Sequence, residues 1–375
     1  MAHGKQYNVF PASALSVQSF IGNGGFGEVF KGSLLVDVAV KYLYNDSGSD
    51  LLKEIKIMQK CRSPYVVDVL GVCPGDQPNK LKLVMEYMER GSLANLLKVI
   101  DEPPPWALVV KVATQVSQGI KFLHSLSPPV LHLDLKPANV LLDKHLNVKL
   151  TDFGLSRVRH SQSYLMQHGE ISDCVIGGTI HYMPPEAFRK PWTPSEATDI
   201  YSFGILLWAL VTRETPYPDV LDTVFSIRIP AGDRPSLDDI DALEDGRPGL
   251  DKLKELMQMC WHQEIPERPT ASDCAERTQE LYEENYNQDA ITSLLEKLDI
   301  KDRESKNPEE QPGSNSNNRH DMKDKRSTNP EEQPESNSNK QQWHRSLSEP
   351  VATYRLEHVV GLQIGDYNKM DFNNH

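Results

Sequence analysis

The sequence lacks the features of a secreted, membrane-spanning or nucleic-acid-binding protein. It has no run of about twenty apolar residues, so we expect no transmembrane helix and no direct membrane anchoring. The N-terminus has no basic region followed by an apolar run, so we expect no signal peptide. The net charge of -13 argues against a protein that binds nucleic acid or anionic membranes mainly by electrostatic attraction.

Cysteines are few and follow no pattern. The five cysteines are scattered and odd in number, and none has the CxxC spacing of a zinc site. We therefore expect free thiols in a reducing compartment rather than a disulfide scaffold. This predicts a cytoplasmic (cytosolic) protein and leaves open whether it also shuttles to the nucleus.

The composition changes along the chain, which indicates four parts. Apolar segments alternate with turns at the density of a globular domain until about residue 285, and apolar residues return at the C-terminus after a polar stretch. We assign an N-terminal extension, a globular domain, a mostly disordered polar linker and a terminal motif region to residues 1–16, 17–285, 286–348 and 349–375.

The polar linker contains an imperfect duplication. Residues 301–342 hold little but Asn, Ser, Glu, Gln, Lys, Asp and Pro, which cannot bury enough apolar surface to offset the entropy of the chain. Within them, residues 307–317 recur at 329–339 with one change. Two polar copies cannot form a solenoid, which needs repeats that bury a face, so we interpret them as linker expansion.

The globular part changes from strand patterns to helix patterns. The first third is β-rich apart from one predicted helix at 51–60, and the rest is mostly helical. This order predicts an α+β, bilobal fold with a β-rich N-lobe and a helical C-lobe. The predicted strands are 16–20, 29–32, 36–42 and 82–86, and the clearest later helices are 106–124 and 198–212.

Short motifs occur in a fixed order along this part of the chain. A glycine loop begins at Gly22, a Val-Ala-Val-Lys run ends at Lys41, a His-Leu-Asp run ends at Asp134, and Asp-Phe-Gly begins at Asp152. A lone glycine loop is weak evidence, because it also marks dinucleotide sites. The full ordered set resembles the protein-kinase signature and predicts ATP, Mg2+ and phosphoryl transfer.

The first motifs would bind the nucleotide. Glycines 22, 24 and 27 (Gly22, Gly24, Gly27) let a hairpin approach the phosphates closely, although an ordinary hairpin is the alternative. Lys41 would contact the α- and β-phosphates, and Glu54 would hold Lys41 unless it is only a surface charge. The predicted nucleotide-binding set also includes Ile21, Val29, the gatekeeper Met85 and the hinge residues Glu86 and Met88.

The later motifs would carry the chemistry. Asp134 would accept the proton of the substrate hydroxyl, and Lys136 would stabilise the transferring γ-phosphate. Asn139 and Asp152 would hold the metal ions. Each acid alone could be a loop cap or a surface charge, but their kinase spacing makes that alternative weak. The segment Asp-Leu-Lys-Pro-Ala-Asn at 134–139 is typical of serine/threonine kinases rather than tyrosine kinases.

Other positions would support the site. Thr179 matches the threonine that contacts the catalytic loop in serine/threonine kinases, Glu186 would pair with Arg268, and Asp199 would hold the catalytic-loop backbone. One departure concerns regulation, because Leu133 stands where kinases usually have an arginine that binds an activation-loop phosphate. We therefore expect activation not to depend on that phosphate contact.

The kinase region as a whole resembles the receptor-interacting protein kinases. The segments that carry the resemblance are 83–93, 131–142, 201–208, 234–237 and 248–261. The C-terminal segment from Leu362 to Met370 is similar to the homotypic interaction motif of that family, whose core is aliphatic-Gln-aliphatic-Gly. The resemblance implies receptor-interacting protein kinase 1 and other proteins with this motif as partners. It also implies a mixed-lineage kinase domain-like pseudokinase as substrate, and roles in necroptosis and innate immunity.

The terminal motif also has a physical logic of its own. Residues 359–365 are short, β-prone, uncharged and free of proline, which is typical of segments that stack as cross-β. Gln363 and Asn368 could form amide ladders between chains, so we expect self-assembly into amyloid-like oligomers. The alternative is a strand that docks on its own kinase domain.

Three functional hypotheses remain, together with one further partner. The chain could be an active kinase triggered by assembly, a non-catalytic scaffold, or an amyloid adaptor whose kinase activity is secondary. The intact Lys41, Asp134 and Asp152 favour the first. The Arg-Ser-Leu-Ser-Glu-Pro sequence that contains Ser348 has the form that 14-3-3 proteins bind once the serine is phosphorylated.

Overall fold

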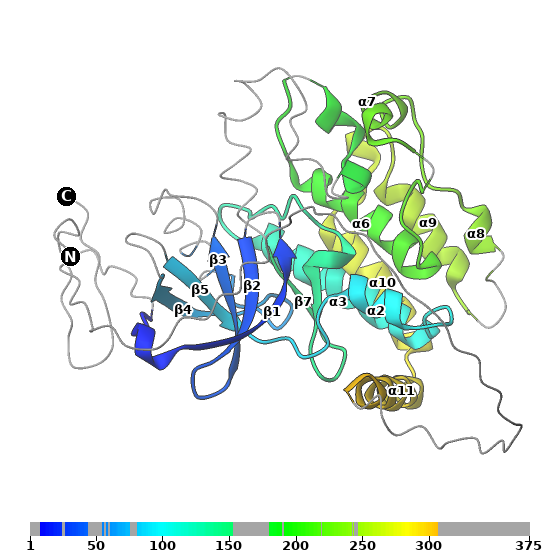
Figure 1. Ribbon diagram of the computed structural model, residues 1–375. Coiled ribbons are helices and arrows are strands. Elements are labelled where there is room, and N and C mark those ends of the chain that lie inside the picture. The colour runs from blue at the N-terminus through cyan, green and yellow to red at the C-terminus, as the bar shows by residue number, and fades with distance from the viewer. Residues whose placement is uncertain are drawn as a thin grey trace, which may run out of the picture.

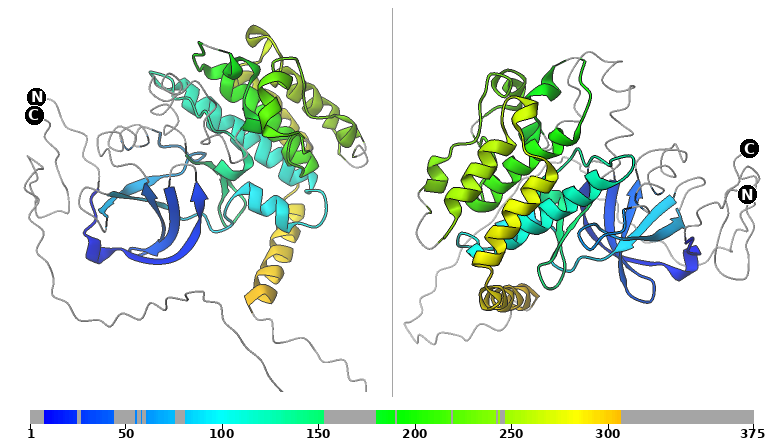
Figure 2. Two further views of the ribbon diagram at one scale, coloured as in Figure 1. Left: turned by 45° about the horizontal axis from the view of Figure 1, so that its top comes forward. Right: turned by 180° about the vertical axis from the view of Figure 1, so that it is seen from behind.

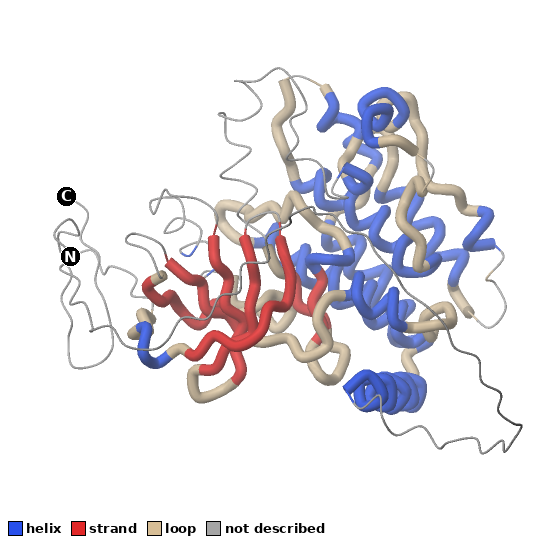
Figure 3. Tube along the Cα trace, in the orientation of Figure 1, coloured by secondary structure: helices blue, strands red, loops and turns tan. Residues whose placement is uncertain are grey.

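The computed structural model has two lobes that meet at one edge of a sheet. It describes residues 8–24, 27–43, 55, 58, 61–75, 81–152, 180–189, 191–218, 220–241, 243 and 247–306. The strands lie together on one side of the molecule and the helices on the other (Figure 3). The predicted fold class is therefore confirmed.

The N-lobe is a five-stranded antiparallel sheet with the order β1-β2-β3-β5-β4 (Figure 1). All four predicted strands are present, and β4 is an additional strand that interior glycine and terminal proline residues disguise in the sequence. Of the predicted helix at 51–60, only Ile55 and Met58 are described, and both are buried. The strands are β1 (Ser16–Gly24), β2 (Gly27–Ser33), β3 (Asp37–Leu43), β4 (Val69–Pro74) and β5 (Leu81–Glu86).

The C-lobe is built around two long helices, α3 (Trp106–Ser125) and α6 (Glu196–Thr212), both of which the sequence predicts. A two-stranded sheet of β6 (Val140–Leu142) and β7 (Val148–Leu150) lies between them and the N-lobe (Figure 1). The other α-helices described are α2 (Leu93–Val99), α7 (Phe225–Arg228), α8 (Asp238–Asp241), α9 (Leu250–Cys260), α10 (Ala271–Asn285) and α11 (Gln288–Lys306). Short 3-10 turns occur at Ala12–Ala14, Pro137–Asn139, Ile180–Tyr182, Pro185–Phe188, Asp222–Val224 and Ile265–Glu267.

Helix α6 is the buried centre of the C-lobe. Nearly all of its side chains are buried, and a capping box between Ser195 and Thr198 satisfies backbone donors at its start. Gly204 allows close packing on α9, because a Cβ there would lie 2.8 Å from the Cβ of Cys260. This rigid centre carries Asp199, which lies in the first turn of α6 and faces the catalytic loop.

The C-terminal boundary of the folded part differs from the sequence prediction. The polar linker was predicted to begin at residue 286, but α11 continues the fold to Lys306. Ile291, Leu294 and Leu298 recur at helical spacing and are buried against the lobe. The charged residues between them dominate the composition and hide this narrow apolar stripe. Figure 2 shows α11 in orange, below the main body of the lobe.

The N-terminal boundary also differs. Residues 8–10 were assigned to an extension outside the domain, but they form part of the N-lobe. Val9 bridges to Val72 in β4, and the Phe10 amide donates to the Val72 carbonyl at 2.8 Å. Gly71 permits this approach, since a Cβ there would lie 2.3 Å from the Asn8 carbonyl oxygen.

Two general expectations can be checked against the described residues. Four of the five cysteines, namely Cys61, Cys73, Cys260 and Cys274, are described, and all four are buried thiols that form no disulfide bond. Within the part of the chain that the structure describes, none of the helices has the length and apolar character needed to cross a bilayer.

Candidate active site

Lys41 reaches the junction of the lobes because of its register in β3. Side chains alternate along a strand, and Val38 and Val40 face a small core on the outer side of the sheet. Lys41 therefore faces the C-lobe, where its Nζ lies 2.6 Å from Oδ1 of Asp152. The Lys41 side chain is 1% exposed, so this ion pair joins β3 to the segment after β7 in a largely dehydrated setting.

The glycine loop lies beside Lys41 across the sheet. Gly22 pairs with Val29, and Val29 pairs with Lys41, so the three residues form one row across β1, β2 and β3. A Cβ on Gly22 would meet no described atom within 4 Å, so packing within the described protein does not require glycine there. The space that this glycine leaves open adjoins the row that ends at Lys41.

The remaining glycine-loop positions are close by. Gly24 pairs with Gly27 at the end of the β1–β2 hairpin. Ile21 is exposed and Val29 is half-buried. This exposure is expected of residues that cover a ligand rather than fill a core. The two residues at the tip, 25 and 26, lie outside the described residues.

The catalytic loop gathers three predicted residues into one cluster. The amide nitrogen of Asn139 donates to both the backbone oxygen and Oδ2 of Asp134, at 2.7 and 2.8 Å. Lys136 Nζ lies 3.0 Å from the same Oδ2. The other carboxylate oxygen of Asp134 is buried and has no hydrogen-bond partner in the described part of the chain. An unpaired carboxylate oxygen is costly unless a ligand completes it, which marks Asp134 as a position prepared for a donor.

Asp199 fixes the backbone of this loop. Its two carboxylate oxygens accept the backbone amides of His132 and Leu133 at 2.8 and 2.7 Å, which confirms the predicted role. Leu133 adopts a left-handed backbone with φ of 62°, a strained conformation that these bonds help to maintain. The sequence reasoning did not identify His124, whose Nε2 lies 2.8 Å from Asp199 Oδ2.

A second buried ion pair fixes the segment that follows the activation region. The guanidinium of Arg268 makes two parallel bonds to Glu186, at 2.7 and 2.8 Å, and the side chain is fully buried. It also donates to the carbonyls of His262 and Ala197. The predicted pairing of Glu186 with Arg268 is confirmed, and it joins three separate parts of the C-lobe.

The hinge residues end β5. Met85 is 4% exposed and pairs with Ala39 in β3, and Met88 is buried just beyond the strand. The carboxylate of Glu86 accepts from Lys149 Nζ and from the Asp68 amide, so its side chain is already engaged within the protein. The Glu86 backbone amide also donates to the Asp68 carbonyl at 3.1 Å, so neither the side chain nor the N–H of Glu86 is left for a ligand.

The sequence analysis also did not name Leu141 as a candidate site residue. In β6, Val140 and Leu142 are buried, while Leu141 between them is half-buried and faces the other way. Side chains alternate between the two faces of a strand, so Leu141 must face away from Val140 and Leu142. Because all three residues are apolar, the sequence does not show which of the two faces is buried.

Several predicted residues cannot be placed. Glu54 and Thr179 lie outside the described residues, as do Phe153, Gly154 and the rest of the segment 153–179. The pairing of Glu54 with Lys41 and the contact of Thr179 with the catalytic loop therefore stay predictions.

A comparison with protein families decides what this arrangement is. The model of the protein tyrosine and serine/threonine kinase family matches residues 15–278. This range covers most of the chain and contains the glycine loop, Lys41, the catalytic loop and Asp152. The chain belongs to the protein kinase family.

The relatives of this kinase narrow the assignment. Receptor-interacting serine/threonine-protein kinase 3 of Homo sapiens is 38% identical over 306 residues, which is 77% of this chain and 57% of the relative. Receptor-interacting serine/threonine-protein kinase 4 of Mus musculus is 36% identical over 286 residues, 73% of this chain and 35% of the relative. Receptor-interacting serine/threonine-protein kinase 2 of Bos taurus is 36% identical over 253 residues, 64% and 45% of the two chains.

These similarities place the kinase among the receptor-interacting kinases and make it a serine/threonine protein kinase. They do not single out one member, because relatives of three kinds have nearly equal identity. The chain spans only 35–57% of the length of these three relatives.

A protein kinase uses ATP and a divalent metal, generally Mg2+, and the described residues fit both. A magnesium ion in such a site is typically held by one or two protein oxygen ligands together with the phosphates of the nucleotide. Asp152 and Asn139 offer oxygen ligands, and the Asn139 amide nitrogen is already directed at Asp134. The open space at Gly22 gives room for phosphates.

The buried catalytic loop predicts a pH dependence of stability. Burial lowers the pKa of the His132 imidazole below its ordinary value of 6.5, and the nearby carboxylates of Asp199, Asp134 and Asp152 offset only part of this effect. Below pH 6.5 the unfolded chain therefore gains a proton that the folded chain does not. We expect the free energy of unfolding to fall with decreasing pH from about 6.5, by at most about 1.4 kcal/mol per pH unit for this one group.

Urea unfolding at pH 7.5, 6.5 and 5.5 measures this slope. A His132→Gln variant has no imidazole at this position, so its slope between pH 6.5 and 5.5 should be shallower than that of the parent. Equal slopes in the two proteins would show that His132 is not the cause.

Proposed function

We propose that this kinase transfers the γ-phosphate of ATP to serine or threonine, using the described cluster of Asp134, Lys136 and Asn139 and the Lys41–Asp152 pair. One observation carries the proposal: three motifs far apart in sequence converge between the lobes, with a carboxylate oxygen of Asp134 left unpaired. A buried carboxylate oxygen without a donor is costly, and the hydroxyl of a bound substrate would supply that donor.

Each residue has a distinct proposed role. Asp134 accepts the hydroxyl proton through its open oxygen, while Asn139 and Lys136 hold its other oxygen in place. Lys41 contacts the α- and β-phosphates, and Asp152 and Asn139 would hold Mg2+. The metal supplies neutralisation of the phosphate charge when bound. Lys136 is also close enough to Asp134 to stabilise the transferring phosphoryl group.

The adenine would lie between the lobes. Met85 and Met88 border this region, and the half-buried Leu141 presents an apolar side chain from the C-lobe. Ile21 and Val29 would cover the nucleotide from the glycine loop, and backbone atoms at Glu86 and Met88 would accept and donate hydrogen bonds. The engaged carboxylate of Glu86 keeps the hinge fixed to β7 through Lys149.

We further propose that the chain is a counterpart of receptor-interacting kinase 3 that acts in the cytosol. The support is a kinase domain of this family followed by a polar linker and a terminal Leu-Gln-Ile-Gly motif. Receptor-interacting protein kinase 1 and other proteins with this motif would recruit it, and amyloid-like self-assembly would raise the local concentration of kinase. Its substrates would be its own chains and a mixed-lineage kinase domain-like pseudokinase, with necroptosis as the outcome.

The proposed assembly can be separated from catalysis. Replacing Gln363, Ile364 and Gly365 together by alanine should abolish sedimentable oligomers and strongly reduce autophosphorylation at low protein concentration. Phosphorylation of an added peptide substrate at saturating concentration should stay within a few-fold of the parent, because the kinase lobes are unchanged.

A triple-alanine variant at Asn315, Ser316 and Asn317 is the matched control, since it makes the same number of changes within the polar linker. It should assemble like the parent. If the motif variant also assembles and phosphorylates itself like the parent, the proposed trigger is wrong. If neither protein has kinase activity in any state, the scaffold or amyloid-adaptor alternative gains.

We also propose that phosphorylated Ser348 binds 14-3-3 proteins, on the basis of its Arg-Ser-Leu-Ser-Glu-Pro context. Pull-down of the phosphorylated full chain tests this. A Ser348→Ala protein that retains full 14-3-3 binding would contradict it.

A further inference from the structure

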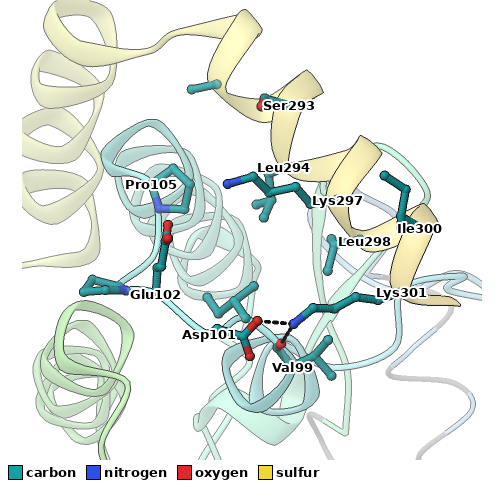
Figure 4. A pocket seen from close by; sticks show the side chains of 13 residues that line it. Val99, Asp101, Glu102, Pro105, Ser293, Leu294, Lys297, Leu298, Ile300 and Lys301 are labelled. Carbon is teal, nitrogen blue, oxygen red and sulfur yellow. Dashed lines mark hydrogen bonds and ion pairs between the residues drawn. The ribbon is translucent and has the colours of Figure 1, made fainter. Parts of the chain in front are cut away.

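A pocket of about 580 Å³ lies between α11 and the connection from α2 to α3. Figure 4 shows that Leu294, Lys297 and Leu298 project from α11 toward the segment that contains Asp101, Glu102 and Pro105. None of the residues that line the pocket belongs to the proposed phosphoryl-transfer site. Its size is that of a typical ligand site.

The pocket has an apolar lining, and aliphatic side chains are exposed to solvent at its mouth. Leu294, Leu298 and Ile100 are buried within it, whereas Val99 and Ile300 are 45% and 53% exposed. Three of the six residues between the two helices, 100–105, are prolines, which have no backbone N–H to donate. The pocket is therefore suited to aliphatic side chains rather than to a strand that needs backbone donors from this wall.

The two walls are fixed to each other. Lys301 Nζ donates to the Val99 carbonyl at 3.0 Å and pairs with Asp101, as the dashed lines in Figure 4 show. Arg90, two residues after the hinge residue Met88, pairs with Asp299 and Asp302 of α11. These contacts keep the pocket open at a set width and link its α11 wall to the segment that follows the hinge.

We propose that this pocket binds the aliphatic segment 359–365 of the same chain, and so shelters the terminal motif while the kinase is at rest. The chain leaves the described structure at Lys306, about 8 Å along the helix axis from Lys301 in the pocket wall. A flexible chain of the length of residues 307–358 has an end-to-end distance of about 40 Å, which is ample to return to the pocket.

The chemistry of the segment matches that of the pocket. Val359, Val360, Leu362 and Ile364 are aliphatic side chains of the size that the pocket can hold, and between residues 301 and 342 the only large apolar residue is a single methionine. Acidic residues at 357 and 366 flank the segment, and Lys297 at the pocket rim is exposed and has no ion pair among the described residues. Tethering favours this occupant over a free partner, because the tail is present at high effective concentration.

Docking and assembly would exclude each other. An aliphatic side chain buried in the pocket cannot also stack in a cross-β core, so docking would keep isolated chains monomeric until a partner with the same motif competes the segment away. The docking itself does not depend on the assembly proposed above, since any aliphatic segment at this position on the tether could bind.

Photo-crosslinking in the full chain tests the proposal. Glu102 lines the pocket and is exposed, so it can be replaced by p-benzoylphenylalanine without loss of the apolar lining. Dilute monomeric protein is irradiated, digested and analysed by mass spectrometry. We expect crosslinks from position 102 to peptides that contain 356–366. In an equal mixture of ¹⁵N-labelled and unlabelled chains, the two peptides of each crosslinked pair should be either both labelled or both unlabelled, because both come from the same chain.

Variants establish that the pocket is responsible. Val99→Glu with Ile300→Glu should reduce the crosslink about tenfold, because two aliphatic contacts are replaced by charges. Leu35→Glu with Val36→Glu is the matched control, since it places the same charges at exposed aliphatic residues in the β2–β3 connection, and it should have no effect. Leu362→Asp with Ile364→Asp changes only the tail, so it tests the same contact should the pocket variant fail to fold.

Other occupants give different results. Mixed-isotope crosslinks would show that the pocket binds the tail of a second copy, and crosslinks to a co-purified lipid or another protein would show an external ligand. Either result, or the absence of a crosslink to the tail, overturns the proposal. If the parent chain never assembles and still gives the crosslink to its tail, the proposed assembly is refuted and the docking stands.

Discussion

Replacement of Asp134 by asparagine should lower the kcat for phosphoryl transfer by about 10²- to 10⁴-fold. The variant keeps the size of the side chain and can still accept the Asn139 amide, but it can no longer take a proton from the substrate hydroxyl. The KM for ATP should stay within a few-fold of the parent, because the Lys41–Asp152 pair and the glycine loop are unchanged. Initial rates of phosphate transfer to a serine/threonine peptide measure both constants.

Asp251→Asn is the matched control, since Asp251 is an exposed acid in the first turn of α9, remote from the cluster. It should have the kcat of the parent. An Asp134→Asn protein with more than a tenth of the parental kcat would show that Asp134 does not act as the base, and would leave its unpaired oxygen without an explanation.

Replacement of Arg268 by alanine should destabilise the kinase by about 3–5 kcal/mol. The guanidinium is fully buried, and its loss leaves the Glu186 carboxylate and two carbonyls without their donors in the C-lobe. For a domain of this size the loss corresponds to a fall in Tm of roughly 10 °C. Thermal unfolding followed by circular dichroism measures it.

Arg277→Ala is the appropriate comparison. Arg277 and Glu255 form an exposed pair 3.9 Å apart, and such pairs contribute at most about 1 kcal/mol. In a double-mutant cycle, Glu186→Gln should remove most of the additional effect of Arg268→Ala. Equal shifts in Tm for the Arg268 and Arg277 variants would mean that the buried pair does not hold the C-lobe together.

The sequence alone predicted features with a local signal. The β-rich pattern identifies the strand that ends near Lys41, and helical spacing identifies α3 and α6. The pairing of Glu186 with Arg268 was also predicted, although more than eighty positions separate them, because each lies in a recognisable kinase motif. The structure brings these motifs together as expected, while their chemical roles stay proposals.

Features that depend on packing alone were not predictable. The apolar stripe of α11 is interrupted by charged residues. Two of them form ion pairs with Arg90 and Asp101, which lie far away in the sequence, so the sequence does not reveal these contacts. The contact of His124 with Asp199 likewise needs α3 and α6 to be side by side, and no pattern within either helix indicates it. The Lys41–Asp152 distance could not be derived either, since it depends on the relative position of the two lobes.

The central claim is that the chain is a working serine/threonine kinase in which Asp152 is essential. The most direct test is phosphate incorporation by the purified full chain with Mg-ATP, compared between the parent and Asp152→Asn, with the modified residue type identified. The account predicts phosphoserine or phosphothreonine with the parent and about 10³-fold less with the variant. No incorporation by a folded, assembled parent, or equal incorporation by both proteins, would contradict it.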